Sequence, residues 1–105
     1  MRTELMGKGF IETPYSLALE RQRYIEELAE SGVAYHTADG RILFVHTGIG
    51  RGIWGTFWRK HNGAGALRRF TRLPMRSTKA EAQQDLAGYA ALRGLKPVDV
   101  EAMQR

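Results

Sequence analysis

The 105-residue chain has no cysteine, which excludes disulfide bonds, thiolate catalysis and cysteine-ligated zinc or iron–sulfur sites. It also has no apolar run long enough for a signal peptide or a membrane span, and we therefore expect a cytoplasmic protein. Hydrophobic residues account for 43% of the chain and charged residues for 26%, which is typical of a globular fold. The length predicts a single domain over residues 1–105, with a small core.

Acidic residues are absent between Asp39 and Glu81, in the middle of the chain. The formal net charge is +5, and this segment is its source, because the rest of the chain holds more acids than bases. Such a concentration of one charge predicts a positive surface that attracts an anionic partner. The basic residues of the segment are Arg41, Arg51, Arg59, Lys60, Arg68, Arg69, Arg72, Arg76 and Lys79.

The acid-free segment also lacks the carboxylates that acid–base and two-metal catalysis require. No G-x-S-x-G motif is present, and Ser77 stands where a helix cap is expected. His36, His46 and His61 do not have metal-ligand spacing, and the glycines of GIGRGIWG fit neither a P-loop nor a dinucleotide fingerprint. We therefore expect no enzyme, no metal and no cofactor.

Two helices are expected, one towards each end of the chain. Residues 14–31 have apolar side chains at helical spacing, with Thr13 as a suitable cap and Gly32 just past the end. The second helix begins at the capping box TKAE, residues 78–81, and ends at Gly94. The expected buried stripes are Leu17, Ala18, Tyr24, Ile25, Leu28 and Ala29 in the first helix and Ala82, Leu86, Tyr89 and Ala90 in the second.

Asp39 and Gly40, between two β-favouring runs, predict a hairpin with a two-residue turn. In that register His36 pairs with Leu43, and the alternation of side chains assigns each residue of the hairpin either to a core face or to the opposite face. The expected core face carries Val33, Tyr35, Thr37, Ile42, Phe44 and His46. The opposite face carries Ala34, His36, Ala38, Arg41, Leu43 and Val45.

The glycine-rich stretch that follows is ambiguous between helix and strand. Its glycines would each cost a helix up to about 1 kcal/mol relative to alanine, and its aromatic and β-branched residues favour a strand. We therefore expect strands at 52–60 and 66–73, joined by a glycine-rich turn at 61–65. Trp54 and Trp58 then lie on the same face of the first of these strands.

The ends of the chain are less regular. Residues 1–12 are expected to fray, and residues 95–105 form either a short helix after Pro97 or a frayed tail. The predicted fold is α+β, with an antiparallel sheet of three to four strands and an N-terminal and a C-terminal helix packed on one face.

Basic and aromatic residues alternate along the two glycine-punctuated strands, as in surfaces that bind nucleic acids. We expect a small nucleic-acid-binding protein, for DNA more than for RNA, that acts mainly through phosphate contacts. One face would offer Trp54, Trp58, Lys60, Arg68 and Arg72, the other Arg51, Arg59 and Arg69, and Arg76 and Lys79 complete the candidate site.

The alternative is a small adaptor or inhibitor that docks on an acidic protein surface, as a homodimer through the first helix. The same basic surface serves either partner, and sequence alone does not separate the two. A membrane partner is disfavoured, because tryptophan and basic residues at a membrane interface normally lie on an amphipathic helix, which the glycines oppose.

From Asp39 to Gly94 the chain resembles the arm-binding domains of tyrosine recombinases, the phage integrases. The matching stretch is RRFTRLPMRSTKAEAQQDLAGYA, a basic strand and then a helix that begins with threonine–x–x–glutamate–alanine. The resemblance implies a three-stranded sheet that lies in the DNA major groove and makes contacts through Arg59, Lys60, Arg68 and Arg72. The chain departs from the family in its long first helix and in having no recombinase catalytic domain.

Overall fold

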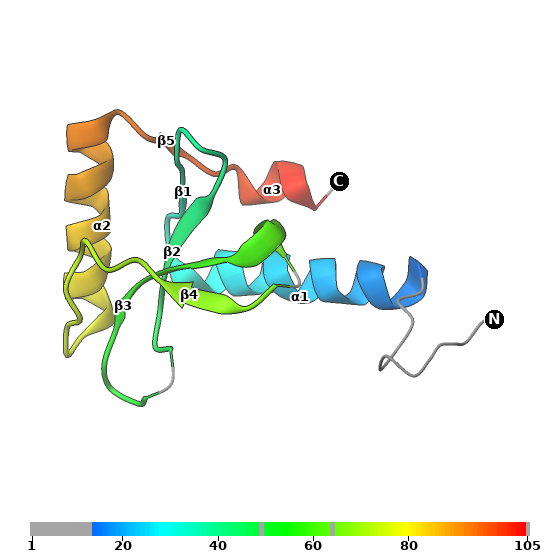
Figure 1. The fold of residues 1–105 in the computed structure, drawn as a ribbon, viewed down its shortest axis with the longest axis horizontal. Helices are drawn as coiled ribbons and strands as arrows, with labels where there is room; N and C mark the ends of the chain where they lie inside the picture. Colours follow the sequence, from blue (N-terminus) through cyan, green and yellow to red (C-terminus); the bar gives the residue numbers. More distant parts are fainter. Residues whose placement is uncertain (1–13, 49, 64, 105) are drawn as a thin grey trace.

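A five-stranded antiparallel sheet forms the centre of the molecule, with strand order β4-β3-β2-β1-β5 (Figure 1). The structure, a computed structural model, describes residues 14–48, 50–63 and 65–104. Its strands are β1 (Tyr35–His36), β2 (Ile42–His46), β3 (Gly55–Arg59), β4 (Leu67–Arg69) and β5 (Lys96–Pro97). Its helices are α1 (Pro14–Ser31), α2 (Lys79–Arg93) and α3 (Val100–Met103).

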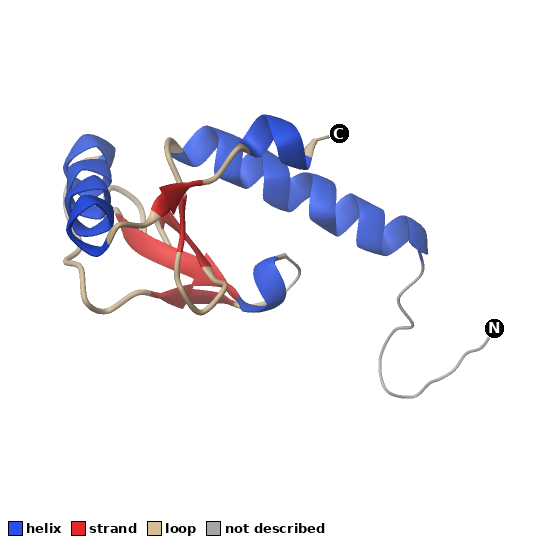
Figure 2. Cartoon of the chain, turned by 90° about the horizontal axis from the view of Figure 1, so that it is seen from above, coloured by secondary structure: helices blue, strands red, loops and turns tan. Residues whose placement is uncertain are grey.

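The predicted α+β class and the N-terminal and C-terminal helices are confirmed, but two details were wrong. The sheet has five strands in the described residues, not three to four. The helices lie on opposite faces of the sheet, not on one (Figure 2). The reason is the composition of β2, in which Ile42, Leu43, Phe44 and Val45 are all buried. A strand that is apolar on both faces needs a covering layer on each side.

α1 and α3 cover one face of the sheet. Tyr24 and Leu28 of α1 pack against Phe44 of β2 and Phe57 of β3, and the Tyr24 and Phe44 rings meet edge to face with centroids 6.4 Å apart. Met103 of α3 closes the edge of this cluster. Residues 96–103, expected as part of a short helix or a frayed tail, therefore form a short strand and a short helix, and Val98, Val100 and Met103 pack against this cluster.

α2 covers the other face. Ala82 and Leu86 pack on Leu43 and Val45 of β2 and on Phe70, which follows β4. Trp54, Trp58, Tyr35, Leu73, Tyr89 and Leu95 surround this second cluster and are partly buried. The expected stripe of α2 is confirmed, with Ala82, Leu86 and Ala90 buried and Tyr89 at its margin.

The register of the β1–β2 hairpin differs from the predicted one by one residue. Tyr35 pairs with Leu43, and the connection is a three-residue loop, 38–40. The backbone N–H of Gly40 donates to the Thr37 carbonyl at 3.1 Å, and Gly40 has φ +89°. Such a loop combines a β-turn with one left-handed residue.

This shift exchanges the faces of the residues before the turn. Ala34 is buried in the cluster under α1, whereas Val33, expected in the core, is 46% exposed. Tyr35 accordingly packs with the cluster under α2. The predicted faces of β2 hold, with the correction that Leu43 and Val45 also face a core.

The stripe of α1 was only partly right. Tyr24, Ile25 and Leu28 are buried, but Leu17 is 47% exposed, and Ala18 and Ala29 are exposed as well. Figure 1 shows that the start of α1 projects past the edge of the sheet. The expected cap Thr13 and the expected fraying of residues 1–12 lie outside the described residues.

The remaining predicted boundaries hold approximately. At the start of α2 the Glu81 N–H donates to Thr78 Oγ1 at 3.2 Å, so Thr78 is the expected helix cap. The Glu81 carboxylate accepts from the Thr78 hydroxyl at 2.9 Å rather than from the Thr78 backbone N–H of a full capping box. β3 and β4 are shorter than predicted. The turn between them is a short 3₁₀ turn, Lys60–Asn62.

Candidate nucleic-acid interface

A groove lies between the β1–β2 hairpin loop, the turn after β4 and the C-terminal half of α2. It consists of two depressions, of about 320 and 350 Å³, that share Thr37, Ala38, Arg93 and Leu95. We call this surface the basic groove. Its charged lining residues are Asp39, Arg41, Arg72, Arg93 and Lys96.

The charge of the basic groove is strongly positive. Its four cations come from three places, namely the start of β2, the turn after β4, and the α2–β5 connection. Among its described lining residues Asp39 is the sole carboxylate. Cations that converge in this way repel one another, and an anion placed between them relieves the repulsion.

Arg41 is held in place by two neighbours. Its Nε lies 3.0 Å and its Nη2 lies 2.9 Å from Asp39 Oδ2, and its guanidinium carbon lies 4.7 Å from the centre of the Trp58 ring. Hydrogen bonds from the Thr37 hydroxyl and from Arg41 lower the pKa of Asp39 to about 2. Asp39 therefore stays ionised at neutral pH and keeps the guanidinium fixed over the ring.

Arg93, at the end of α2, also lies over an aromatic ring. Its guanidinium carbon lies 5.3 Å from the centre of the Tyr89 ring, and that ring meets Phe70 edge to face at 5.2 Å. A cation in the last helical turn also interacts favourably with the helix dipole. Arg72 and Lys96 are exposed on the two flanks of the groove.

Three of the predicted site residues are brought to this side of the molecule. Trp58 and Arg68 are a cross-strand pair of β3 and β4 on the α2 side, and Arg72 follows in the next turn. Arg68 is exposed but does not line the groove. Of the predicted residues, Arg72 lines the groove together with Arg41, and Trp58 lies beneath the Arg41 guanidinium.

The other predicted residues lie elsewhere. Arg51 and Lys60 are exposed on separate loops. Arg69 pairs with Phe57 across the strands and so lies on the α1 side, exposed. Arg76 is bound by Asp85 at 2.7 Å and 3.1 Å, and this hydrogen-bonded pair raises the pKa of Arg76.

Arg59 forms a structural ion pair rather than part of the basic groove. Its Nε and Nη2 donate to the two carboxylate oxygens of Glu27 on α1, at 2.7 and 2.9 Å, and these bonds raise the pKa of Arg59. Glu27 also contacts His46 Nε2 at 3.2 Å, while His46 Nδ1 accepts the Gly48 N–H at 2.8 Å. Because Nδ1 is an acceptor, Nε2 carries the proton. The network ties α1 to β2 and β3.

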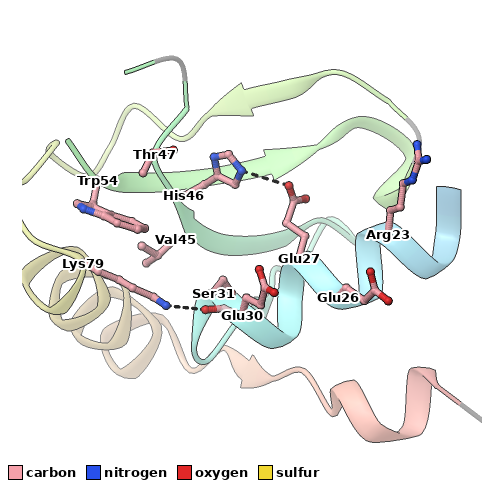
Figure 3. A pocket seen from close by; sticks show the side chains of 10 residues that line it. All are labelled: Arg23, Glu26, Glu27, Glu30, Ser31, Val45, His46, Thr47, Trp54 and Lys79. Atoms are coloured by element: carbon pink, nitrogen blue, oxygen red, sulfur yellow. Dashed lines mark hydrogen bonds and ion pairs between the residues drawn. The ribbon is translucent and has the colours of Figure 1, made fainter. Parts of the chain in front are cut away.

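Trp54 and Lys79 border a different hollow, of about 460 Å³, between the end of α1 and the sheet (Figure 3). The α1 wall of this hollow carries Glu26, Glu27 and Glu30. Lys79 crosses it, donating from Nζ to the Glu30 backbone carbonyl. Its three carboxylates outnumber its arginine and lysine, Arg23 and Lys79, which makes this hollow a poor place for a phosphate.

Sequence reasoning missed Arg93, Lys96 and Tyr89 as candidate site residues, because they lie outside the acid-free segment. Arg41 was counted among the basic residues but not assigned to the site. Two signals in the sequence mark the segments that lie on either side of the groove, namely the hairpin loop and the helix end at Gly94. Only the fold shows that those two ends meet.

Two further findings, on metal ligands and on membrane crossing, apply to the described residues alone. Across residues 14–48, 50–63 and 65–104, no three histidine, aspartate or glutamate side chains are grouped as metal ligands would be. None of the described helices combines the length and the apolar character that crossing a membrane requires.

Comparisons with protein-family models, with curated proteins and with solved structures found no match to this chain. The resemblance of residues 39–94 to the arm-binding domains of tyrosine recombinases therefore remains an expectation from their sequence.

Proposed function

We propose that the protein binds nucleic acid through the basic groove, mainly by contacts with phosphates. The observation that carries the proposal is that Arg41, Arg72, Arg93 and Lys96 line two adjoining depressions, whose sole described carboxylate, Asp39, is itself bonded to Arg41. Arginine presents a planar fork of donors that matches phosphate oxygens. The preference for DNA rests on the resemblance to the arm-binding domains.

A nucleic acid fits this surface better than an acidic protein does. Protein interfaces gain most of their affinity from large apolar or aromatic side chains buried at the centre of the contact. The exposed large hydrophobic side chains of the described residues do not line the basic groove; they are Leu17, Leu19, Val33, Ile53 and Leu92. Phe70, Tyr89 and Leu95 do line the groove, but Phe70 is buried and the Tyr89 ring lies beneath Arg93, so cations rather than open apolar side chains dominate the surface offered to a partner. Such a surface is typical of backbone recognition.

The test is a titration of the protein into a fluorescein-labelled duplex oligonucleotide, followed by anisotropy over a range of salt concentrations. If all four cations neutralise phosphates, log K falls against log salt with a slope of about −3 to −4. Absence of binding at low salt, both to this duplex and to a single-stranded oligonucleotide, would contradict the proposal. Tighter binding to poly-glutamate than to the duplex would instead support the acidic-protein alternative.

A further inference from the structure

We infer that the target is a double-stranded nucleic acid held by its phosphate backbone, not a single strand whose bases stack on the protein. This inference rests on the proposed function and names the substrate class of the same groove. It follows from the state of the aromatic rings around the cations. Proteins that bind single strands pair a basic groove with open aromatic faces, on which successive bases stack.

The Trp58 ring is covered. It packs against the cluster under α2, and Arg41 lies over it at 4.7 Å. A base could reach this ring only if Arg41 moved, and that movement would also break the contacts of Arg41 with Asp39. Arg41 thus blocks the ring while it presents its own charge at the groove.

The rings on the α2 side of the groove are covered as well. Tyr89 lies beneath Arg93 at 5.3 Å and touches Phe70 edge to face, and Phe70 itself is only 7% exposed. The second tryptophan, Trp54, borders the acid-walled hollow and has the Lys79 ammonium 5.9 Å from its ring centre. A strand stacked on Trp54 would bring its phosphates towards Glu26 and Glu30 (Figure 3).

The cations themselves suit a regular array of phosphates. Arg41 contacts both Asp39 and Trp58, so its side chain has less freedom to lose on binding than that of an unpaired arginine, and the Arg93 guanidinium lies over the Tyr89 ring. A duplex offers phosphates at fixed positions and a higher charge density than a single strand, and it releases more counterions at each contact. The positive charge of the basic groove therefore suits a duplex.

The experiment compares a DNA duplex, an RNA duplex and an unstructured thymidine oligonucleotide with the same number of phosphates, at one salt concentration. Because of its higher charge density we expect a duplex to bind at least about tenfold more tightly than the single strand. The two duplex arms identify which kind of duplex is preferred. With Trp54→Phe as background, Trp58 becomes the sole tryptophan, and its emission should change little on binding.

Two results would overturn the inference, and they differ from each other. Equal or tighter binding of the single strand, with quenching of Trp58, would show base stacking while leaving the proposed function intact. No binding of any of the three oligonucleotides would remove both the proposed function and the inference.

Arg41→Ala supplies a second, independent readout, with Arg72→Ala as its matched control. Both variants lose one groove arginine, but only Arg41→Ala uncovers Trp58. We expect Arg41→Ala to lower duplex affinity more than single-strand affinity, so that the preference for the duplex over the single strand becomes smaller. Arg72→Ala should weaken duplex binding too, but the preference for the duplex should stay larger than in Arg41→Ala. Equal preferences in the two variants would contradict the role given to Arg41 as a cover.

Discussion

At the residue scale, the loop carboxylate Asp39 links the fold of the hairpin to the charge of the basic groove. It accepts hydrogen bonds from Thr37 and Arg41, and they lower its pKa from 3.8 to about 2. Because the folded pKa lies below the unfolded one, the stabilisation is present above about pH 4 and is lost as the pH falls towards 2.

The corresponding prediction concerns Asp39→Asn. Near neutral pH the variant should unfold more readily than the wild type, and the difference in the free energy of unfolding should close between about pH 4 and 2. Urea denaturation at a series of pH values measures that difference. A difference that stays constant down to pH 2 would show that ionisation of Asp39 does not matter to the fold.

The second residue-scale prediction separates Arg59 from the binding surface. Arg59 has a partly buried side chain bonded to Glu27, so Arg59→Ala should destabilise the fold by about 1–3 kcal/mol. Because Arg59 lies on the α1 side, duplex affinity should hardly change. Arg23→Ala, an exposed arginine on α1, is the control for the lost charge. Weaker duplex binding without loss of stability would instead show that Arg59 is part of the binding interface.

At the scale of elements, local sequence patterns predicted the positions of the helices and the hairpin, but not how these elements pack. The helical spacing after residue 14 and the capping box at Thr78 place α1 and α2 correctly. The hairpin was placed correctly, but its loop length was not, since Thr37 bonds across the loop to Arg41 and lengthens it by one residue. A one-residue difference reverses the faces of the preceding residues, as Val33 and Ala34 show.

The prediction at this scale compares two loops that both need a left-handed glycine. At Gly40, with φ +89°, an added Cβ would meet no atom within 4 Å, so Gly40→Ala should cost only about 1–2 kcal/mol of backbone strain. At Gly48, with φ +66°, the same Cβ would lie 2.6 Å from the Phe57 ring, which belongs to the α1-side core.

Gly48→Ala should therefore destabilise the protein more than Gly40→Ala does. Urea denaturation of the two variants beside the wild type measures the difference. Equal costs would mean that the connection after β2 moves away from Phe57 freely, and that this segment does not help to fix the sheet.

At the scale of the whole molecule, the basic groove is a product of the tertiary fold. The acid-free segment indicated a positive surface, but Arg59, Arg76 and Lys79 of that segment are bonded to acidic side chains or to backbone of other elements. Arg93 and Lys96, from a part of the chain with ordinary charge, take their place. Charge patterning in sequence cannot predict this exchange, because it depends on which carboxylates α1 and α2 bring within reach.

The last prediction tests the groove as one electrostatic unit. Arg72→Ala combined with Arg93→Ala removes two of its four cations, and both side chains are exposed, so the circular dichroism spectrum should be retained. Each phosphate contact contributes about 0.9 to the slope of log K against log salt, and the double variant should therefore bind more weakly with a slope shallower by about 2. Arg21→Ala with Arg23→Ala removes the same charge from exposed positions on α1 and serves as the matched control.

If the basic groove makes the contacts, the control pair should leave the slope within about half a unit of the wild-type value. Charges that do not touch the nucleic acid neutralise no phosphate, and salt largely screens their effect at a distance. If the protein instead attracts nucleic acid through its overall net charge, the two double variants should lose affinity and slope to the same extent. That second outcome would contradict the basic groove as a site, since position would then have no effect and only the number of positive charges would count.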